Sequence, residues 1–326
     1  MTEVNLVQAV NMALARALED DDRVVVLGED VGIDGGVFRA TNGLVGRFGP
    51  ERVIDTPLAE ALIAGMSVGM AAAGLRPVAE IQFMGFMFPT IDQMGCHASR
   101  LRNRTRGRLT CPMVLRAPYG GGVHAPEHHS ESTEAMFAHI PGLRVVIPSS
   151  PRRAYGLLLA AIRDPDPVVF LEPKRLYRAI TEDVADDGRA LPLDKAFVLR
   201  EGRDITLVTW GAMTSETLAA AEELAASGLE AEVMDVATLN PFDPAPVLAS
   251  VRKTGRCMIV HEAVRSGGFG AEIVATIAEH GLLDLVAPVK RITAPDTVVP
   301  LARMEELYMP QVDAIATGAQ QLMEYA

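Results

Sequence analysis

Short runs of β-branched residues alternate with segments of helical periodicity along most of this chain, and this alternation constrains the fold most strongly. Apolar positions recur at helical spacing through residues 5–19, whereas residues 23–27 form a short β-branched run. The same change of pattern recurs through residues 143–172 and 205–293. Parallel strands joined by crossover helices produce such an alternation. The sequence therefore predicts an α/β fold in which largely parallel sheets are flanked by helices.

One weakly periodic stretch divides the pattern into two halves. Residues 180–204 are acidic and interrupted by proline and glycine, as is typical of a connecting segment. We therefore predict one domain over residues 1–185, a linker over 186–203 and a second domain over 204–326. A chain of 326 residues with 49% apolar residues is long enough to build two such cores.

Charge and composition exclude several classes of function. A formal net charge of -12 argues against nucleic acid as the main partner. No uncharged apolar run is long enough for a membrane-spanning helix, and the start of the chain lacks the pattern of a signal peptide. The 3 cysteines are scattered and form no disulfide pattern, so a cytoplasmic location is expected.

The segment Asp55-Thr56-Pro57-Leu58-Ala59-Glu60 places a carboxylate where an apolar helix is expected to begin. Thr56 suits the N-cap of that helix and Pro57 its first position. Glu60 has two interpretations. It is either a first-turn acid favoured by the helix dipole, or a carboxylate in a dry site whose raised pKa lets it handle a proton.

A family resemblance favours the second interpretation. The segment RVIDTPLAEALIAGMSVGMAAAGLRPVAEIQF resembles the pyrimidine-binding half of thiamine-diphosphate enzymes. More closely, it resembles the β subunit of the E1 component of 2-oxo acid dehydrogenase complexes. Further similar segments follow the same order along the chain, among them VVVLGEDVGIDGGVFRAT, IQFMGFMFPTIDQ, RAPYGGGVHAPEHHSES, IPGLRVVIPSSP, FLEPKRLYRA and TAPDTVVP. The resemblance implies a pyrimidine-binding domain followed by a domain like the C-terminal domain of transketolase.

The resemblance also assigns roles to residues of the first domain. In this family a glutamate hydrogen-bonds the aminopyrimidine ring and so promotes deprotonation of the thiazolium carbon, which makes Glu60 catalytic and cofactor-binding. Phe86 would pack on the ring, with Gln82 and Leu58 lining the same pocket. Glu29 would be a second acid near the pocket. The alternatives are a core aromatic for Phe86 and an exposed turn acid for Glu29.

Several histidines gather in residues 124–139. His124 and His128 are four residues apart, but neighbouring glycines and a proline argue against the helix that a zinc site at this spacing needs. The resemblance singles out His129 as a catalytic residue of the substrate channel that assists acyl transfer to a lipoyl group. A histidine suits this role because its charge changes near neutral pH.

Metal binding is expected to be divided between this chain and a partner. Thiamine enzymes hold Mg²⁺ through a Gly-Asp-Gly segment, and this chain contains none. The resemblance therefore implies an α subunit that supplies most of the Mg²⁺ ligands. Some relatives bind potassium near the positions of Asp164 and Asp166, although ordinary turn chemistry explains these two residues equally well.

Together these expectations describe one subunit of an α2β2 enzyme of the lipoamide-linked 2-oxo acid dehydrogenase type (EC 1.2.4). It would decarboxylate a 2-oxo acid through thiamine diphosphate and acylate the lipoyl group of an E2 acyltransferase. The substrate stays open between pyruvate and branched-chain 2-oxo acids. The alternatives are a subunit of another thiamine enzyme, such as acetoin dehydrogenase or a transketolase-like enzyme, and a docking subunit without catalysis.

Overall fold

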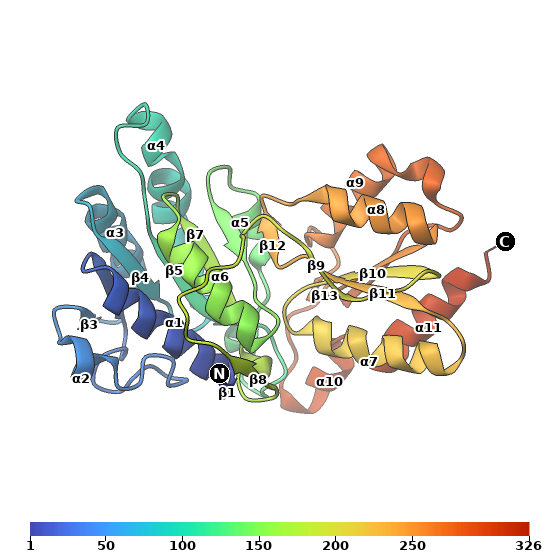
Figure 1. The fold of residues 1–326 in the computed structure, drawn as a ribbon, viewed down its shortest axis with the longest axis horizontal. Helices are drawn as coiled ribbons and strands as arrows, with labels where there is room; N and C mark the ends of the chain where they lie inside the picture. Colours follow the sequence, from blue (N-terminus) through green and yellow to red (C-terminus); the bar gives the residue numbers. More distant parts are fainter. Residues whose placement is uncertain (326) are drawn as a thin grey trace. The chain divides into compact units, whose positions relative to one another are not determined.

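The computed structural model describes residues 1–325, and these residues form two compact units (Figure 1). The first unit comprises Met1–Tyr119 and Met136–Leu193. The second comprises Gly120–Ala135 and the chain from Asp194 onward. The short segment Gly120–Ala135 therefore leaves the first unit, joins the second and returns. None of the helices in the described part of the chain is long and apolar enough to cross a bilayer.

The first unit is built on a parallel sheet whose strands lie in the order β6-β7-β5-β4-β2-β3. Their residues are almost all buried, as expected for parallel strands covered on both faces. The strands are β2 (Val24–Gly28), β3 (Val53–Asp55), β4 (Arg76–Glu80), β5 (Val114–Tyr119), β6 (Arg144–Val146) and β7 (Val168–Pro173). A separate antiparallel pair joins β1 (Thr2–Asn5) to β8 (Thr181–Val184).

Helices cover both faces of this sheet. The connections β6–α6–β7 and β3–α3–β4 cross the sheet in opposite directions, so right-handed crossovers place α6 and α3 on opposite faces. Helix α1 packs beside α6, as Figure 1 shows. Asn5 starts α1 with a capping box, in which its side chain accepts from the backbone N–H of Gln8. The helices are α1 (Leu6–Asp20), α2 (Leu44–Phe48), α3 (Glu60–Ala72), α4 (Leu101–Arg104) and α6 (Pro151–Arg163).

The second unit is a three-layered α/β structure around strands in the order β14-β13-β10-β11-β9. All neighbours are parallel except β9, which pairs antiparallel with β11 at the edge. Helices α7 and α11 cover one face of the sheet, and α8 and α9 the other (Figure 1). The elements are β9 (Phe197–Arg200), β10 (Ile205–Thr209), α7 (Met213–Ala226), β11 (Ala231–Asp235), α8 (Pro244–Thr254), β13 (Cys257–Val264), α9 (Gly270–His280), β14 (Lys290–Ala294), α10 (Glu305–Tyr308) and α11 (Val312–Met323).

The α/β class with mostly parallel sheets is confirmed, and two local expectations need correction. The segment expected as a linker contains strand β9, whose short pattern was hidden among proline, glycine and acidic residues. The pattern of residues 91–102 predicts a single helix, but the structure has a π-helical turn at Gln93–His97, a 3₁₀ turn at Ala98–Arg100 and the short α4. A broken helix buries its apolar residues at irregular spacing, which a helical periodicity does not reveal.

Candidate active site

The carboxyl ends of three adjacent strands gather three of the expected site residues in the first unit. Glu29 follows β2, Glu60 follows β3 at the start of α3, and Gln82 follows β4. The chain runs from β2 outward to β3 and then crosses to β4 on the other side of β2. In α/β sheets ligands bind at the carboxyl ends of the strands, beside such a reversal of strand order.

Glu60 is the first residue of α3 and is half-buried in this chain. The predicted cap is wrong: Ala59 is the N-cap, and the helix has no side-chain cap. Thr56 instead follows β3 and donates its backbone N–H to the Gly28 carbonyl at 2.9 Å, which ties the two strand ends together. The helix therefore begins with N–H groups that no side-chain cap satisfies, and Glu60 places a carboxylate in that first turn.

The Glu29 carboxyl lies close enough to Glu60 for the charge of Glu60 to affect its pKa. Burial raises the pKa of the Glu29 carboxyl above its ordinary value, and the charges of Asp30 and Glu60 raise it further. The Gln82 amide donates to the Asp30 carboxylate at 3.3 Å, which links the loops after β4 and β2. The structure thus brings Glu29, Glu60 and Gln82 to one edge of the sheet, and their roles in a cofactor site stay predictions.

Phe86 belongs to an aromatic cluster in the same unit. Its ring meets Phe83 edge-on at 5.5 Å between centroids, and Phe83 meets Phe38 in the same way at 5.5 Å. Phe38 in turn lies 5.2 Å from Tyr177. Phe86 itself is partly buried. Edge-to-face contacts of this kind fix the plane of a ring.

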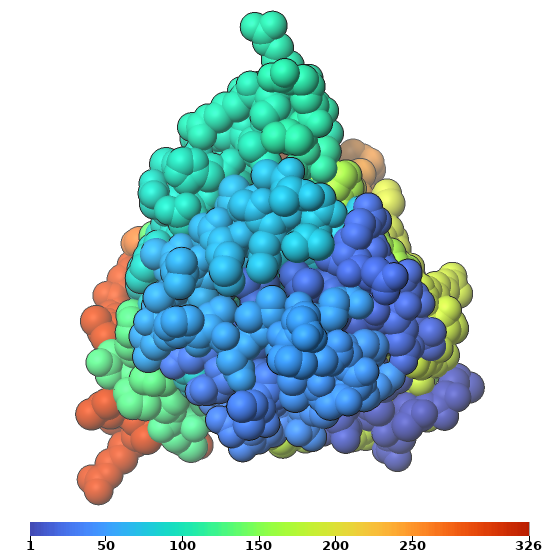
Figure 2. Space-filling view, turned by 90° about the vertical axis from the view of Figure 1, so that its left-hand side faces the viewer, coloured from blue at the N-terminus to red at the C-terminus, as the bar shows by residue number. Residues whose placement is uncertain are grey.

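An apolar surface surrounds the start of α3. Leu58 is 70% exposed and Leu62 is 50% exposed in this chain. Helix α3 is apolar almost throughout, yet Ile63, Ala64 and Ser67 lie buried while much of the rest of the helix is open. In Figure 2 the light-blue residues of this region lie at the surface. Exposed apolar residues grouped in this way are typical of an interface.

Asp55, the last residue of β3, organises the loop after β2. Its carboxylate accepts from the backbone N–H groups of Gly32 at 2.6 Å and Ile33 at 3.2 Å. A Cβ at Gly32 would lie 2.7 Å from that carboxylate, so the close approach requires glycine there. The signal that could have identified this contact is the acid at a strand end opposite a glycine-rich loop.

His129 lies in the segment Gly120–Ala135, which the structure assigns to the second unit. It ends a short 3₁₀ turn, Glu127–His129, in which its own N–H donates to the Pro126 carbonyl at 2.9 Å. His128 Nδ1 lies 3.2 Å from the Glu131 carboxylate. The expected absence of a long helix around His124 and His128 is confirmed.

The predicted potassium site remains a prediction. Asp164 pairs with Arg144 at 3.1 Å, and Asp166 pairs with Arg102 at 2.7 Å. Arg76 also donates to the Asp164 carbonyl at 3.2 Å. In this structure the negative charge of the turn is thus already met by guanidinium groups. Residues 1–325 contain no group of three or more His, Cys, Asp or Glu side chains that could hold a metal ion.

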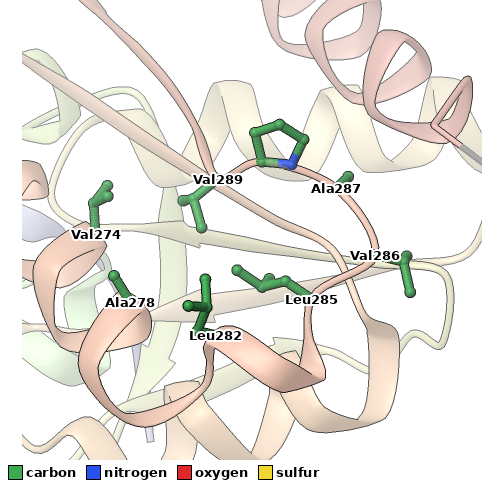
Figure 3. A pocket seen from close by; sticks show the side chains of 8 residues that line it. Val274, Ala278, Leu282, Leu285, Val286, Ala287 and Val289 are labelled. Carbon is green, nitrogen blue, oxygen red and sulfur yellow. The ribbon is translucent and has the colours of Figure 1, made fainter.

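An apolar pocket lies in the second unit between α9 and residues 282–289, which precede β14 (Figure 3). Figure 3 shows Val274, Leu285 and Val289 among the side chains that surround it. The adjacent Leu283 is 99% exposed and Leu282 is 60% exposed. This surface lacks acids, bases or nucleophiles in its lining, so it suits binding rather than catalysis.

The fold and the carboxyl-edge site define a chain of the transketolase type. The family model described as Transketolase, pyrimidine binding domain, matches residues 2–180, and the model described as Transketolase, C-terminal domain, matches residues 194–315. A solved structure titled "Split gene transketolase, inactive beta4 tetramer" has a TM-score of 0.82, with 22% identity over 99% of both chains. At that identity the likeness concerns the fold alone.

The curated relatives define the family more narrowly. The pyruvate dehydrogenase E1 component subunit beta of Acholeplasma laidlawii is 49% identical over 99% of this chain and 98% of its own length. The proteins of the same name from Bacillus subtilis and Staphylococcus aureus are 46% and 45% identical, each over 100% of both chains. The chain belongs to this family of pyruvate dehydrogenase E1 β subunits.

Proposed function

We propose that this chain is the β subunit of a pyruvate-type E1 enzyme and acts together with an α subunit. The observation that carries the proposal is the constellation of Glu60, Glu29, Gln82 and Phe86 at the carboxyl edge of the first sheet. The name shared by the relatives favours pyruvate over branched-chain 2-oxo acids as the substrate.

The residues of the first unit fit the aminopyrimidine half of thiamine diphosphate. Glu60 presents a carboxylate at a helix start, where it can hydrogen-bond a ring nitrogen. Phe86 offers a partly buried aromatic ring and Leu58 an exposed apolar side chain, against which the flat ring would pack. When bound, the cofactor supplies the carbanion-stabilising chemistry that decarboxylation of a 2-oxo acid requires.

The roles of this chain's own residues follow from their chemistry. Glu60 holds and exchanges a proton at the aminopyrimidine ring nitrogen. Burial and the charges of Asp30 and Glu60 raise the pKa of Glu29, which would make it a second acid with increased proton affinity near Glu60. His129 acts at the acyl-transfer stage, where a group that changes charge near neutral pH can give or take a proton.

Two partners complete the proposed enzyme. An α subunit would hold Mg²⁺ and the diphosphate and would cover the apolar surface at Leu58 and Leu62. An E2 lipoyl acyltransferase would accept the acyl group, and the second unit would contribute to its docking, for which the pocket in Figure 3 offers apolar surface. The assembly would be an α2β2 heterotetramer.

Substitution Glu60→Gln tests the proposed role of the carboxylate. The amide keeps the size of the side chain but cannot exchange the proton, so the assembled enzyme should lose pyruvate decarboxylation by a factor of at least roughly 10². Asp22→Asn, at a fully exposed acid, is the matched control and should leave the rate unchanged. Assembly with the α subunit should be normal in both variants. Undiminished turnover in the Glu60→Gln enzyme would remove Glu60 from the mechanism.

A further inference from the structure

The run Gly120-Gly121-Gly122 has a conformation that distinguishes it from an ordinary flexible loop. Gly120 has φ +85° and Gly122 has φ +84°, both in the left-handed region that favours glycine. His124, two residues later, has φ +58° although it carries a side chain. A histidine in this region is uncommon and costs conformational energy, so surrounding contacts must hold it there.

Two buried carboxylates supply these contacts. Glu262 in β13 is 4% exposed, and its Oε2 accepts from the backbone N–H of Gly121 at 3.2 Å. Glu305 at the start of α10 is 1% exposed and binds two N–H groups. Its Oε1 accepts from Gly122 at 2.6 Å, and its Oε2 accepts from His124 at 2.8 Å. Hydrogen bonds to an ionised acceptor are stronger than neutral ones, so Glu305 holds the backbone at two points.

The glycines are what allow the carboxylates to approach so closely. A Cβ at Gly120 would lie 2.4 Å from Oε1 of Glu262, a distance that real Cβ atoms essentially never show. A Cβ at Gly121 would lie 3.0 Å from Oε1 of Glu305. Successive backbone N–H groups that converge on one anion form a nest. In this protein the anions are the chain's own side chains.

The same loop is closed and anchored at its far end. The N–H of Gly120 donates to the Glu131 carbonyl at 3.0 Å, so residues 120–131 form a closed loop that contains His129. Beyond this closure, Nε1 of Trp210 donates to the buried carboxylate of Glu134 at 3.2 Å. The Ser130 hydroxyl also donates to the Ala125 carbonyl at 3.3 Å, across the short turn that carries His129. His129 is therefore held between a carboxylate-bound end and a tryptophan-bound end.

We propose that Glu262 and Glu305 are positioning residues that fix the loop carrying His129 for acyl transfer. The inference rests on the proposed function for the role of His129 and adds what determines the placement of that residue. Neither carboxylate has a contact with substrate in the proposal; both act through the loop backbone. Small displacements of a catalytic group cost large factors in rate, so this anchoring has a measurable kinetic consequence.

The experiment uses the assembled holoenzyme with Glu305→Ala, Glu305→Gln, His129→Ala and the double variant of Glu305→Ala with His129→Ala. The matched control is Glu306→Gln, a change at an exposed acid on the same helix. Four quantities are measured for each variant. They are the rate of lipoyl acylation, the affinity for thiamine diphosphate, the extent of assembly with the α subunit, and the rate of hydrogen exchange at the amides of Gly122 and His124.

Glu305→Ala should lower lipoyl acylation by roughly 10²-fold and speed exchange at both amides, while cofactor affinity and assembly stay within a factor of about two. Glu305→Gln should lose less, since one amide oxygen still accepts one of the two N–H bonds. In the His129→Ala background, Glu305→Ala should lower the acylation rate less than about threefold. The effects of residues that act through one group do not add.

Several results would overturn the proposal. One is that Glu305→Ala lowers the acylation rate by the same factor whether or not His129 is present. Another is that hydrogen exchange at the two amides does not change. A third is that cofactor affinity and assembly fall in parallel with the acylation rate. If Glu305→Ala does not assemble, the isosteric Glu305→Gln decides by the same criteria. A wild-type holoenzyme that does not acylate a lipoyl group would refute the proposed function instead. The exchange measurement would still test whether Glu305 holds the backbone of the loop.

Discussion

Arg116→Met removes a guanidinium from a buried ionic network in the first unit and should destabilise the chain strongly. Arg116 on β5 is fully buried and forms two parallel hydrogen bonds to Glu172 on β7, each of 2.7 Å. It also pairs with Glu80 at the end of β4. The Tyr177 hydroxyl donates to the same Glu172 carboxylate at 2.5 Å. Three adjacent parallel strands are thus joined by one guanidinium.

The expected loss follows from what the variant leaves behind. Glu80 and Glu172 would stay buried without a counter-charge, and breaking a buried pair in this way costs about 3–5 kcal/mol, a factor of roughly 10² to 10⁴ in the unfolding equilibrium. Burial already raises the pKa of Glu80, and the Arg116 charge opposes that rise. Without Arg116 the pKa rises further.

The raised pKa of Glu80 determines how the loss of stability in Arg116→Met changes with pH. A carboxyl whose pKa is raised in the folded state binds more protons there than in the unfolded state, so stability falls as pH rises through that range. The loss caused by Arg116→Met should therefore be larger at pH 8 than at pH 5. Urea unfolding of the chain, followed by circular dichroism at both pH values, measures it.

Two comparisons make this test specific. Arg102→Met removes an exposed pair with Asp166, whose side chains are 45% and 35% exposed, and should cost less than about 1 kcal/mol. Adding Glu80→Gln and Glu172→Gln to Arg116→Met removes all three charges and should restore most of the stability. A loss below about 1 kcal/mol for Arg116→Met, or a loss that grows on acidification, would refute the reasoning.

The remaining predictions concern a buried histidine and an exposed leucine. His261 is fully buried against Trp210, with rings 5.0 Å apart, and burial with the nearby Arg291 charge lowers its pKa to about 4. Neutral His261 therefore contributes up to about 3 kcal/mol to the free energy of unfolding above about pH 6.5. This contribution is lost as the pH falls toward 4. His261→Phe should abolish that part of the pH dependence of urea unfolding, and an unchanged slope would contradict it. Leu62→Glu should weaken co-purification with the α subunit at least tenfold, whereas Leu283→Glu, an equally drastic change in the second unit, should not; equal effects would refute the assignment of that interface.

The sequence predicted the elements whose pattern is local. Helix α1 and strand β2 lie within a residue or so of their expected positions, because periodicity and β-branched runs are properties of neighbouring residues. The N-cap of α3 was misplaced because Thr56 is used instead to join two strand ends, a contact between residues far apart in the chain. Strand β9 was missed because it is an edge strand of only 4 residues, too short a run to stand out in the segment predicted as a linker.

The candidate site divides in the same way. Glu29, Glu60 and Gln82 each follow a strand, and parallel strands bring their carboxyl ends to one edge. Their roles at a cofactor come from the family resemblance and stay predictions. The assignment of the His129 loop to the second unit was not predictable. It depends on Glu262 and Glu305, which lie 141 and 183 residues along the chain from the glycines they bind. Without the structure, the three glycines indicated only a turn.

Calorimetric titration of thiamine diphosphate with Mg²⁺ tests the central claim most directly, because the claim is that this chain supplies only the aminopyrimidine side of the site. The titration is made on this chain alone and on the chain co-expressed with its α subunit. The account predicts binding to the assembly and none to the isolated chain. Tight binding to the isolated chain would contradict it, since the chain would then hold the diphosphate by itself.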